Sequence, residues 1–341
     1  MPSLRTELTL DFPCTGVSSS PGGRLFIVQP RIDGTPGPQI SEIVEGSPTP
    51  FPDEEWNSWE PGKDAATHFV RANAQRVGPD GALWVVDVGG PGLGGTPVKG
   101  GPKLVKISLG SNVVERVYLL DDVTSPRSGI DDVRFNATTA YLTDAGDPGL
   151  IVLDLATGAA RRALDGDVTT TAGEAVSAEG AVLRDVDGAE VLLHADQLEV
   201  SPDGSVLYFQ ACCGPLWAVP TKAIDDSELK DADLAKLVVL HAQTTSTGGT
   251  AIGADGTIFI SDTNARAIWT IAPTGERTLL IQDDRLLWVD AMWIDAANRL
   301  WLPAAELNRM TIFSGAPAPL ESRLHVYSID VGVGPANNDH L

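Results

Sequence analysis

Polar turn residues and apolar strand residues alternate along the whole chain, and residues 77–87 show this pattern most clearly. Pro79, Asp80 and Gly81 favour a tight turn, because proline presets φ, aspartate bonds its own backbone and glycine accepts a positive φ. The β-branched and aromatic run 83–86 that follows favours a buried strand. This stretch therefore predicts a strand, a turn and a second strand.

The same pattern occurs six times, each time with an aromatic residue in the strand that follows the turn. The copies lie at residues 21–28, 79–87, 136–144, 202–209, 254–262 and 298–302. Their aromatic residues, which stand roughly 40 to 70 residues apart, are Phe26, Trp84, Tyr141, Tyr208, Phe259 and Trp301. This spacing fits one four-stranded blade per copy. We therefore predict an all-β fold, a six-bladed β-propeller, with residues 1–341 as a single domain.

Some segments depart from the repeat. We assign residues 1–60 to the first blade, and the less regular residues 160–195 predict an excursion before the fourth blade. Residues 221–237 have helical charge spacing and capping candidates, which predicts a helical insertion at the outer edge. Residues 332–341 predict a frayed tail. The glycine-rich stretch 89–95 lacks the end of a phosphate-binding loop, so we expect a flexible loop.

The net charge of the chain limits the classes of partner that we expect. The chain has a net charge of −22 and a pI near 4.4. Nucleic acids and anionic membrane surfaces bind cationic patches, so we expect neither as a partner. No stretch approaches the ~20 apolar residues of a membrane span, and the first residues lack an apolar signal region. We therefore expect a cytoplasmic monomer that binds a small-molecule substrate.

The cysteines indicate no disulfide framework. The chain has three, Cys14, Cys212 and Cys213, which is too few for such a scaffold. Cys212 and Cys213 are adjacent, and a disulfide between neighbours is strained and rare. We therefore expect all three to be small buried residues.

The candidate chemistry lies on the axis of the expected ring. The innermost strand of each propeller blade lines the axial channel, and here that strand is the segment before each turn. Alignment of these segments on their turns places six residues near the channel mouth: Thr15, Asn73, Asp131, Asp196, Gly248 and Asp290. Carboxylates packed together raise one another's pKa, so this cluster requires a cation, a shared proton or a basic ligand.

Asp131, Asp196 and Asp290 are therefore both the candidate catalytic residues and the candidate metal ligands. Ca²⁺ fits best, because it takes about six to eight oxygen ligands in irregular geometry. Softer metals fit less well, because no histidine or cysteine falls at these positions. The open alternative is that these aspartates cap strands or bond loop backbone. No organic cofactor is predicted.

Weaker candidates surround this set. Glu306 follows the last strand of the repeat and is a fourth candidate catalytic residue, with a surface position as the alternative. The candidate substrate-binding residues are Asn73, Gln75, Asp132, His194 and Thr247. His194 and His241 each precede an inner strand, where either is a candidate general base or an ordinary loop histidine. We find no Ser–His–Asp arrangement.

Several segments carry a family resemblance, in order from about residue 20 to 315. They are residues 51–57, 102–105, 131–134, 140–146, 149–158, 201–204, 207–210, 283–290 and 306–309. In these segments the chain resembles the yellow/major royal jelly protein family, which implies a six-bladed propeller. Members of that family include pigment-pathway enzymes, amine-binding proteins, and nutritive or signalling proteins.

The inner-strand pattern is also similar to the calcium-dependent gluconolactonase superfamily. That similarity implies a metal held by a glutamate, an asparagine and an aspartate on different inner strands. Asp196 stands at the position of the asparagine and Asp290 at that of the aspartate, while Asn73 or Asp131 matches a substrate-contacting asparagine.

Three residues depart from these patterns. Thr15 stands at the glutamate position of the lactonases, Gly248 where yellow-like proteins tend to have aspartate, and Glu306 where they tend to have glutamine. These departures gather at the expected channel mouth. We therefore expect a changed ligand on an unchanged scaffold.

Three functions follow as expectations. The first is an enzyme in which a carboxylate of raised pKa transfers protons in an isomerisation, tautomerisation or cyclisation of a small polar substrate, the reaction type that the yellow-like resemblance implies. The second is calcium-dependent lactone hydrolysis, in which the ion polarises the carbonyl and activates water. The third is a protein that binds an amine or another small ligand in the acidic ring without turnover.

Overall fold

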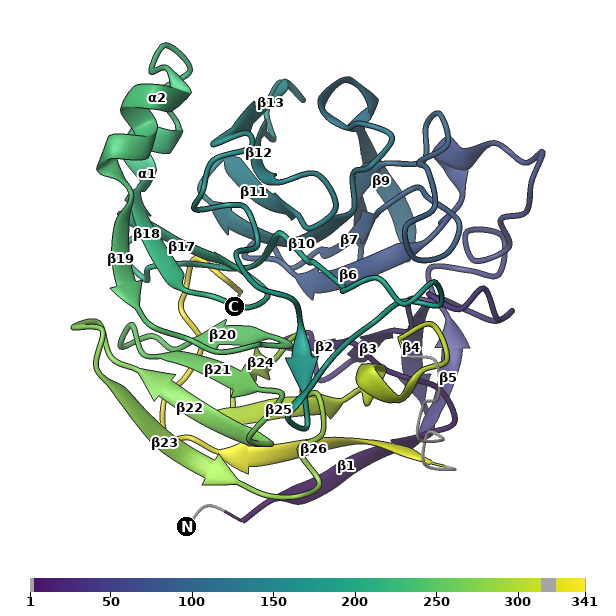
Figure 1. Ribbon diagram of the computed structural model, residues 1–341. Helices are drawn as coiled ribbons and strands as arrows, with labels where there is room; N and C mark the ends of the chain where they lie inside the picture. The colour runs from purple at the N-terminus through teal and green to yellow at the C-terminus, as the bar shows by residue number, and fades with distance from the viewer. Residues whose placement is uncertain (1–2, 314–322, 341) are drawn as a thin grey trace.

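The turn-and-strand repeat forms six four-stranded antiparallel sheets arranged as a ring (Figure 1), which confirms the six-bladed propeller. The structure, a computed structural model, describes residues 3–313 and 323–340. Most apolar runs are buried along their whole length, as in the strand Leu83–Asp87. The reason is that each blade packs apolar side chains against both of its neighbours.

The first three blades follow one another along the chain, and in each of them the strands succeed one another from the ring axis outwards. Blade 1 contains β2 (Gly16–Ser19), β3 (Leu25–Val28), β4 (Ile40–Val44) and β5 (Ser47–Pro50). Blade 2 contains β6 (Ala72–Val77), β7 (Leu83–Asp87), β8 (Lys103–Ser108) and β9 (Val113–Leu119). Blade 3 contains β10 (Ile130–Asn136), β11 (Thr139–Asp144), β12 (Gly149–Asp154) and β13 (Ala160–Ala163).

The remaining three blades complete the ring. Blade 4 contains β16 (Ala195–Val200), β17 (Val206–Ala211), β18 (Leu216–Pro220) and β19 (Val239–Ala242). Blade 5 contains β20 (Thr250–Ile252), β21 (Ile258–Asp262), β22 (Ala267–Ile271) and β23 (Arg277–Gln282). Blade 6 contains β24 (Trp293–Ile294), β25 (Arg299–Ala304), β26 (Leu324–Asp330) and β1 (Arg5–Leu10).

The N-terminal strand closes the ring. β1 pairs antiparallel with β26, so the outer strand of the last blade comes from the start of the chain. This pairing corrects the assignment of residues 1–60 to the first blade, which begins only at Gly16. The physical reason is that β26 would otherwise leave an unpaired sheet edge, and β1 supplies the missing hydrogen bonds.

The turn residues and the aromatic strand residues support each other. The indole Nε1 of Trp84 donates a hydrogen bond to Oδ1 of Asp80 (3.0 Å), and the same oxygen accepts from the backbone N–H of Ala82 (3.1 Å). Gly81 has the positive φ of +72° that the turn requires. Blade 6 repeats this arrangement, because Trp301 donates to Asp295 (2.9 Å).

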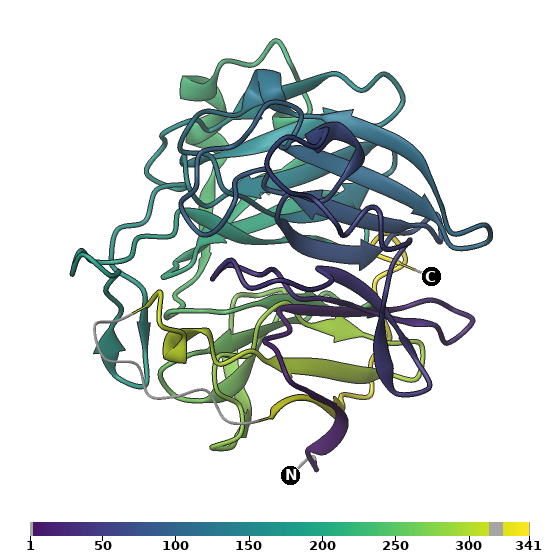
Figure 2. The same ribbon diagram turned by 90° about the vertical axis from the view of Figure 1, so that its right-hand side faces the viewer.

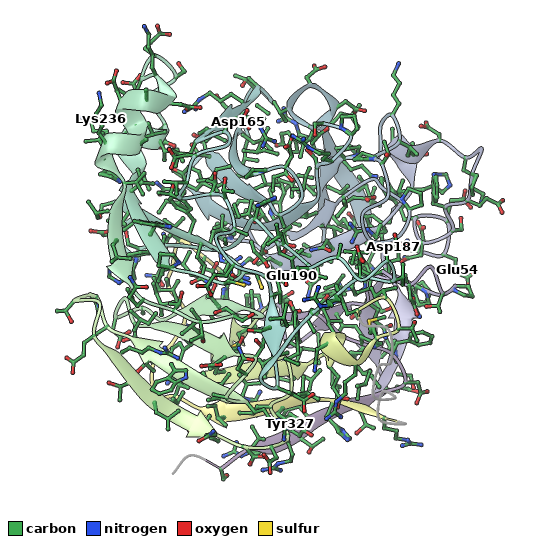
Figure 3. All side chains as sticks on the ribbon, in the orientation of Figure 1. Glu54, Asp165, Asp187, Glu190, Lys236 and Tyr327 are labelled. Atoms are coloured by element: carbon green, nitrogen blue, oxygen red, sulfur yellow. The ribbon has the colours of Figure 1, made fainter. Side chains whose placement is uncertain are left out.

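The segment 221–237 forms a helical insertion between two outer strands. It contains α1 (Thr221–Ile224), α2 (Asp231–Leu234) and the 3-10 helix η3 (Ala235–Leu237). Figure 3 shows Lys236 of this insertion at the outer edge of the ring. The other 3-10 turns are η1 (Ala65–Thr67), η2 (Asp121–Val123) and η4 (Leu307–Arg309). Within residues 3–313 and 323–340, no helix is long and apolar enough to cross a membrane.

A long segment between blades 3 and 4 crosses one face of the ring, and we call residues 172–194 the strap (Figure 1). It contains the short hairpin β14 (Ser177–Ala178) and β15 (Ala181–Val182). The strap is fixed to blades 5 and 6 through Glu179, which forms ion pairs with Arg266 (2.5 Å) and Arg309 (3.3 Å). Figure 3 shows Glu190 of the strap over the middle of the ring in this view.

The C-terminal tail lies on the opposite face from the strap (Figure 2). Asp339 is buried and accepts two hydrogen bonds from Arg76, at 2.7 and 2.8 Å. The imidazole of His340 stacks on Trp293, with ring centroids 3.5 Å apart. The expectation of a frayed tail is therefore wrong at Asp339 and His340, which this ion pair and this stacking hold. Residue 341 lies outside the described residues.

The cysteines are free thiols, and their burial differs. Cys14 and Cys212 are buried, as expected, but Cys213 is partly exposed. The expectation of three buried cysteines is thus corrected at Cys213, which lies in the turn after β17.

Candidate functional site

The six positions aligned on the turns line one cavity on the ring axis. The cavity is lined by Thr15, Asn73, Ala74, Asp131, Asp132, Asp196, Gln197, Gly248, Gly249, Thr250, Asp290 and Ala291. The cavity has a volume of about 20 Å³, which is room for about one water molecule. Residues from all six blades therefore converge, although the residues themselves are up to 275 positions apart.

Three inner strands carry a bulge where they meet the cavity. The pairing register shifts between Ala72 and Ala74, between Ile130 and Val133, and between Ala195 and Leu198. Asn73, Asp131 and Asp196 lie within these shifts. A bulge re-aims a side chain and locally ends the pairing, which explains how these polar groups face the axis from strands whose next residues are buried.

Asp131 and Asp196 form a carboxyl pair in the cavity, in which each group shifts the pKa of the other. Burial, followed by the charge of Asp132, raises the pKa of Asp131 to about 7. Burial, followed by the charges of Asp131 and Asp290, raises the pKa of Asp196 well above its ordinary range. Because both pKa values are raised, the pair holds at least one proton at pH values below about 7.

Asp290 faces the same cavity but is held by its own neighbours. Its Oδ2 accepts a hydrogen bond from the indole of Trp288 (3.1 Å), and its Oδ1 accepts from the backbone N–H of Ala291 (2.9 Å). Burial is the largest cause that raises the pKa of Asp290 well above its ordinary range. This carboxyl group is therefore a fixed acceptor whose charged form is disfavoured.

Arg71 is a residue of the site that the sequence reasoning missed. It is buried, its Nη1 donates to Oδ1 of Asn73 (3.2 Å), and its Nε donates to the backbone oxygen of Gly90 (3.1 Å). Burial lowers the pKa of Arg71 to about 10, against the charges of Asp131 and Asp87. The sequence signal that could have identified Arg71 is its position two residues before Asn73, which the alignment on the turns places near the ring axis.

Asp87 positions this arginine. Its Oδ1 accepts from the backbone N–H of Arg71 (3.0 Å), and its Oδ2 accepts from that of Val70 (2.8 Å) and from the fully buried ammonium of Lys103 (2.6 Å). In blade 3, Asp144 likewise accepts from the backbone N–H of Gly129 (2.8 Å). These aspartates end the second strand of a blade and fix the loop that enters the inner strand.

A second charged layer lies below the cavity. Asp132 lines the cavity but its Oδ2 pairs with Arg134 (2.6 Å), and Arg134 also forms two hydrogen bonds with Glu199, at 2.8 and 2.9 Å. Asp339 of the tail approaches Arg134 to 3.7 Å from the far side. The channel is therefore filled by ion pairs beneath the cavity.

Gln75 and Thr247 do not line the cavity. Both ends of the Gln75 amide bond to blade 1, through Ser18 (2.5 Å) and the backbone oxygen of Phe26 (3.2 Å). Thr247 is buried beside Gly248, and its hydroxyl donates to the backbone of Thr245 (2.9 Å). The functional roles predicted for Gln75 and Thr247 stay predictions.

His194 and Glu306 also lie elsewhere. The imidazole Nδ1 of His194 accepts from the backbone N–H of Ala172 at the foot of the strap (3.1 Å), and burial lowers its pKa. Glu306 lines a separate pocket between blades 5 and 6, where it pairs with Arg309 (3.3 Å). The structure thus brings neither residue to the carboxyl pair.

The arrangement of side chains in the axial cavity bears on the predicted calcium site. The described part of the chain contains no group of three or more histidine, cysteine, aspartate or glutamate side chains spaced to hold a metal ion. Both oxygens of Asp290 are engaged, the Asn73 oxygen accepts from Arg71, and Thr15 adds no charge. Protein donors thus already engage the oxygens of Asp290 and Asn73, and calcium binding at this cavity stays a prediction.

Comparisons with solved structures show the same fold. The luciferin-regenerating enzyme is 11% identical and has a TM-score of 0.62, with 100% of both chains covered. A gluconolactonase from Xanthomonas campestris is 11% identical and has a TM-score of 0.56, with 96% of this chain and 89% of that chain covered. Identities this low support the six-bladed ring and carry no information about the reaction.

Sequence comparison gives the family. Protein yellow from Drosophila erecta is 32% identical over 139 residues, which are 38% of this chain and 26% of the relative's own length. The family described as Major royal jelly protein matches residues 75–323, a range that includes Asp131, Asp196 and Asp290. The match covers most of the chain and agrees with the observed propeller. The chain therefore belongs to the major royal jelly protein family.

Proposed function

We propose that the axial cavity is an active site, in which Asp131 and Asp196 act as an acid/base pair on a small polar organic substrate. The observation that carries this proposal is the convergence of two carboxyl groups of raised pKa on one axial cavity. A general acid and a general base are most effective when their pKa values lie near the working pH. The pair meets this condition through Asp131.

The proposed reaction is a proton transfer between two atoms of the substrate, as in a tautomerisation, an isomerisation or a cyclisation. Asp131 in its charged form removes a proton from one substrate atom, and Asp196 gives its proton to another. The proton then passes from Asp131 back to Asp196 within the carboxyl pair, so the enzyme returns to its starting state. Arg71 stabilises negative charge that develops on the substrate.

Two further observations support a ligand in the cavity. The hydroxyl of Thr15 is buried and has no hydrogen-bond partner among the described residues. A buried hydroxyl normally has a partner, so a bound molecule is the simplest one here. The cavity has room for about one water molecule, and the strap crosses one face of the ring. Binding of a larger substrate therefore requires the cavity to widen.

The test uses phenylpyruvate, whose keto–enol conversion changes its ultraviolet absorbance, as the first probe of a panel of enolisable compounds. Asp131→Asn and Asp196→Asn should each abolish a conversion that the unmodified protein accelerates. Asp255→Asn is the matched control, because Asp255 is an exposed turn residue that accepts only a backbone hydrogen bond (3.0 Å). Full activity in both cavity variants, with unchanged circular dichroism, would contradict the acid/base proposal.

Calcium-dependent lactone hydrolysis is the alternative proposal. The observation that favours it is that oxygen-bearing side chains of four blades, those of Asn73, Asp131, Asp196 and Asp290, line one cavity. The test is the calcium content of the purified protein, the change of Tm with chelator, and the hydrolysis of glucono-δ-lactone. A bound ion together with turnover would replace the first proposal. Amine binding without turnover of any probe would instead indicate a binding protein.

A further inference from the structure

Two adjacent cysteines occupy the centre of a tight turn next to the strap. Cys212 and Cys213 follow β17, and the turn is closed by a hydrogen bond from the backbone N–H of Gly214 to the oxygen of Ala211 (2.8 Å). Both are free thiols; Cys212 is fully buried, whereas Cys213 is partly exposed. One thiol of the pair is therefore open to a small reagent, and its partner lies directly behind it.

Both thiols contact the loop that enters blade 5. The thiol of Cys212 donates to the backbone oxygen of Thr247 (3.2 Å), and the thiol of Cys213 lies 3.9 Å from the hydroxyl of Ser246. Thr247 is the residue before Gly248 in the cavity wall. The thiol pair therefore touches the wall of the axial cavity from outside.

The same loop anchors the strap. The hydroxyl of Ser246 accepts from the backbone N–H of Ser177 (3.1 Å), and Thr263 donates to the backbone oxygens of both Ser177 (2.6 Å) and Ser246 (3.0 Å). Cys212 also belongs to the apolar cluster that the strap forms with the ring, together with Val176 and Trp288. Any change at the thiol pair thus reaches the anchor of the strap directly.

We propose that Cys212 and Cys213 form a redox modification site, at which a hydroperoxide oxidises the two thiols to a disulfide between adjacent residues. The thiolate of Cys213 attacks the peroxide oxygen, so a sulfenic acid forms and water or an alcohol leaves. The Cys212 sulfur then attacks the sulfenic sulfur, the S–S bond forms, and a second water leaves. Two thiols are oxidised and one peroxide is reduced.

The roles of the two thiols follow from their environment. The pKa of Cys213 is lowered and that of Cys212 is raised, and the largest cause in each case is the neighbouring cysteine. Cys213 is therefore both the more accessible thiol and the more readily ionised one, which suits the first attack. Cys14 lacks these features, because it is buried and its thiol donates to the backbone of Gly16 (3.3 Å).

Oxidation should loosen the strap. The disulfide removes the S–H donor to Thr247 and draws Cys213 away from Ser246, two contacts at the strap anchor. The redox state of the pair therefore controls how firmly the strap is held to the loop that enters blade 5. The modification itself does not depend on which reaction the cavity performs.

The test starts from the reduced full-length protein, which is treated with hydrogen peroxide and then with a maleimide. The peptide that carries both cysteines should lose two hydrogens and take up no maleimide after denaturation, while Cys14 stays fully labelled. Hydrogen exchange in residues 176–183 should become faster after oxidation and return to its starting rate with a thiol reductant.

Cys213→Ser and Cys14→Ser are the matched variants. Cys213→Ser should lose the intramolecular disulfide and show no faster exchange in the strap, whereas Cys14→Ser should behave like the unmodified protein. Maleimide uptake at both Cys212 and Cys213 after peroxide treatment would overturn the proposal. So would a disulfide that leaves exchange in residues 176–183 unchanged, because the strap would then be independent of the pair.

Discussion

The buried ion pair between the C-terminal tail and the ring is open to a direct test with Asp339→Asn. Asp339 binds Arg76 through two hydrogen bonds and lies 3.7 Å from Arg134. Arg134 keeps Glu199 as a partner, but Arg76 has no other acceptor in the described hydrogen bonds and ion pairs. The variant therefore leaves a buried guanidinium without its counter-charge.

The expected loss of stability in Asp339→Asn is large for a substitution that replaces one carboxyl oxygen with an amide nitrogen. Removal of one partner from a buried ion pair costs about 3–5 kcal/mol, and we expect about 3 kcal/mol because asparagine keeps one acceptor oxygen. At ~2.1 cal/mol/K of unfolding entropy per residue, a chain of 341 residues should lose roughly 4 °C in Tm. Asp330→Asn is the control, since Asp330 is exposed and accepts from the backbone N–H of Gly332 (3.1 Å).

The pH dependence of stability gives a second test of the ion pair between Asp339 and Arg76. Burial by itself raises the pKa of Asp339, but the charge of Arg76 and the bond from His340 outweigh burial and hold it well below its ordinary range. A depressed pKa contributes stability above the unfolded value of ~3.9, and this stability is lost as the pH falls below it. The difference between the unmodified protein and Asp339→Asn should therefore be full at neutral pH and shrink in acid. Equal Tm values for Asp339→Asn and Asp330→Asn at neutral pH would refute the reasoning.

Three further predictions concern the cavity, a turn and the strap. Because the pKa of Asp131 is raised to about 7, the free energy of unfolding should fall as the pH rises from about 4 to about 7, and Asp131→Asn should flatten this slope in urea titrations. Gly81→Ala should cost about 1–2 kcal/mol in the same assay because φ is +72°. Gly110→Ala should cost little, because its φ is not positive and an added Cβ would make only an ordinary contact with Ser108 at 3.8 Å; equal losses would contradict this. Glu179→Gln weakens the pairs with two arginines, so hydrogen exchange in residues 176–183 should become faster, and unchanged exchange would show that other contacts hold the strap.

The fold and the position of the cavity were predictable because their signals are local. A turn such as 79–81 and a strand such as 83–86 are determined by neighbouring residues, and six copies of them leave one closed architecture. The turns also fix where each inner strand starts. Alignment on the turns therefore identified Asp131, Asp196 and Asp290 as cavity residues, while their chemical roles stay predictions.

The partners of the charged residues were not predictable from the sequence. Arg76 and Asp339 are 263 residues apart, and nothing near either residue indicates the other. The same holds for Glu179, whose partners lie in blades 5 and 6, and for Arg71, which meets Asp131 across two blades. Each pairing depends on which side chains the closed ring brings together.

The sequence by itself determined the blades, the turns and the ring of polar positions, because backbone preferences and apolar alternation act over a few residues. The tertiary structure alone decided that β1 completes the last blade, that bulges turn Asn73, Asp131 and Asp196 towards the axis, and that the tail is buried. These features arise from burial and charge pairing between distant segments, and such energies exist only once the ring has closed.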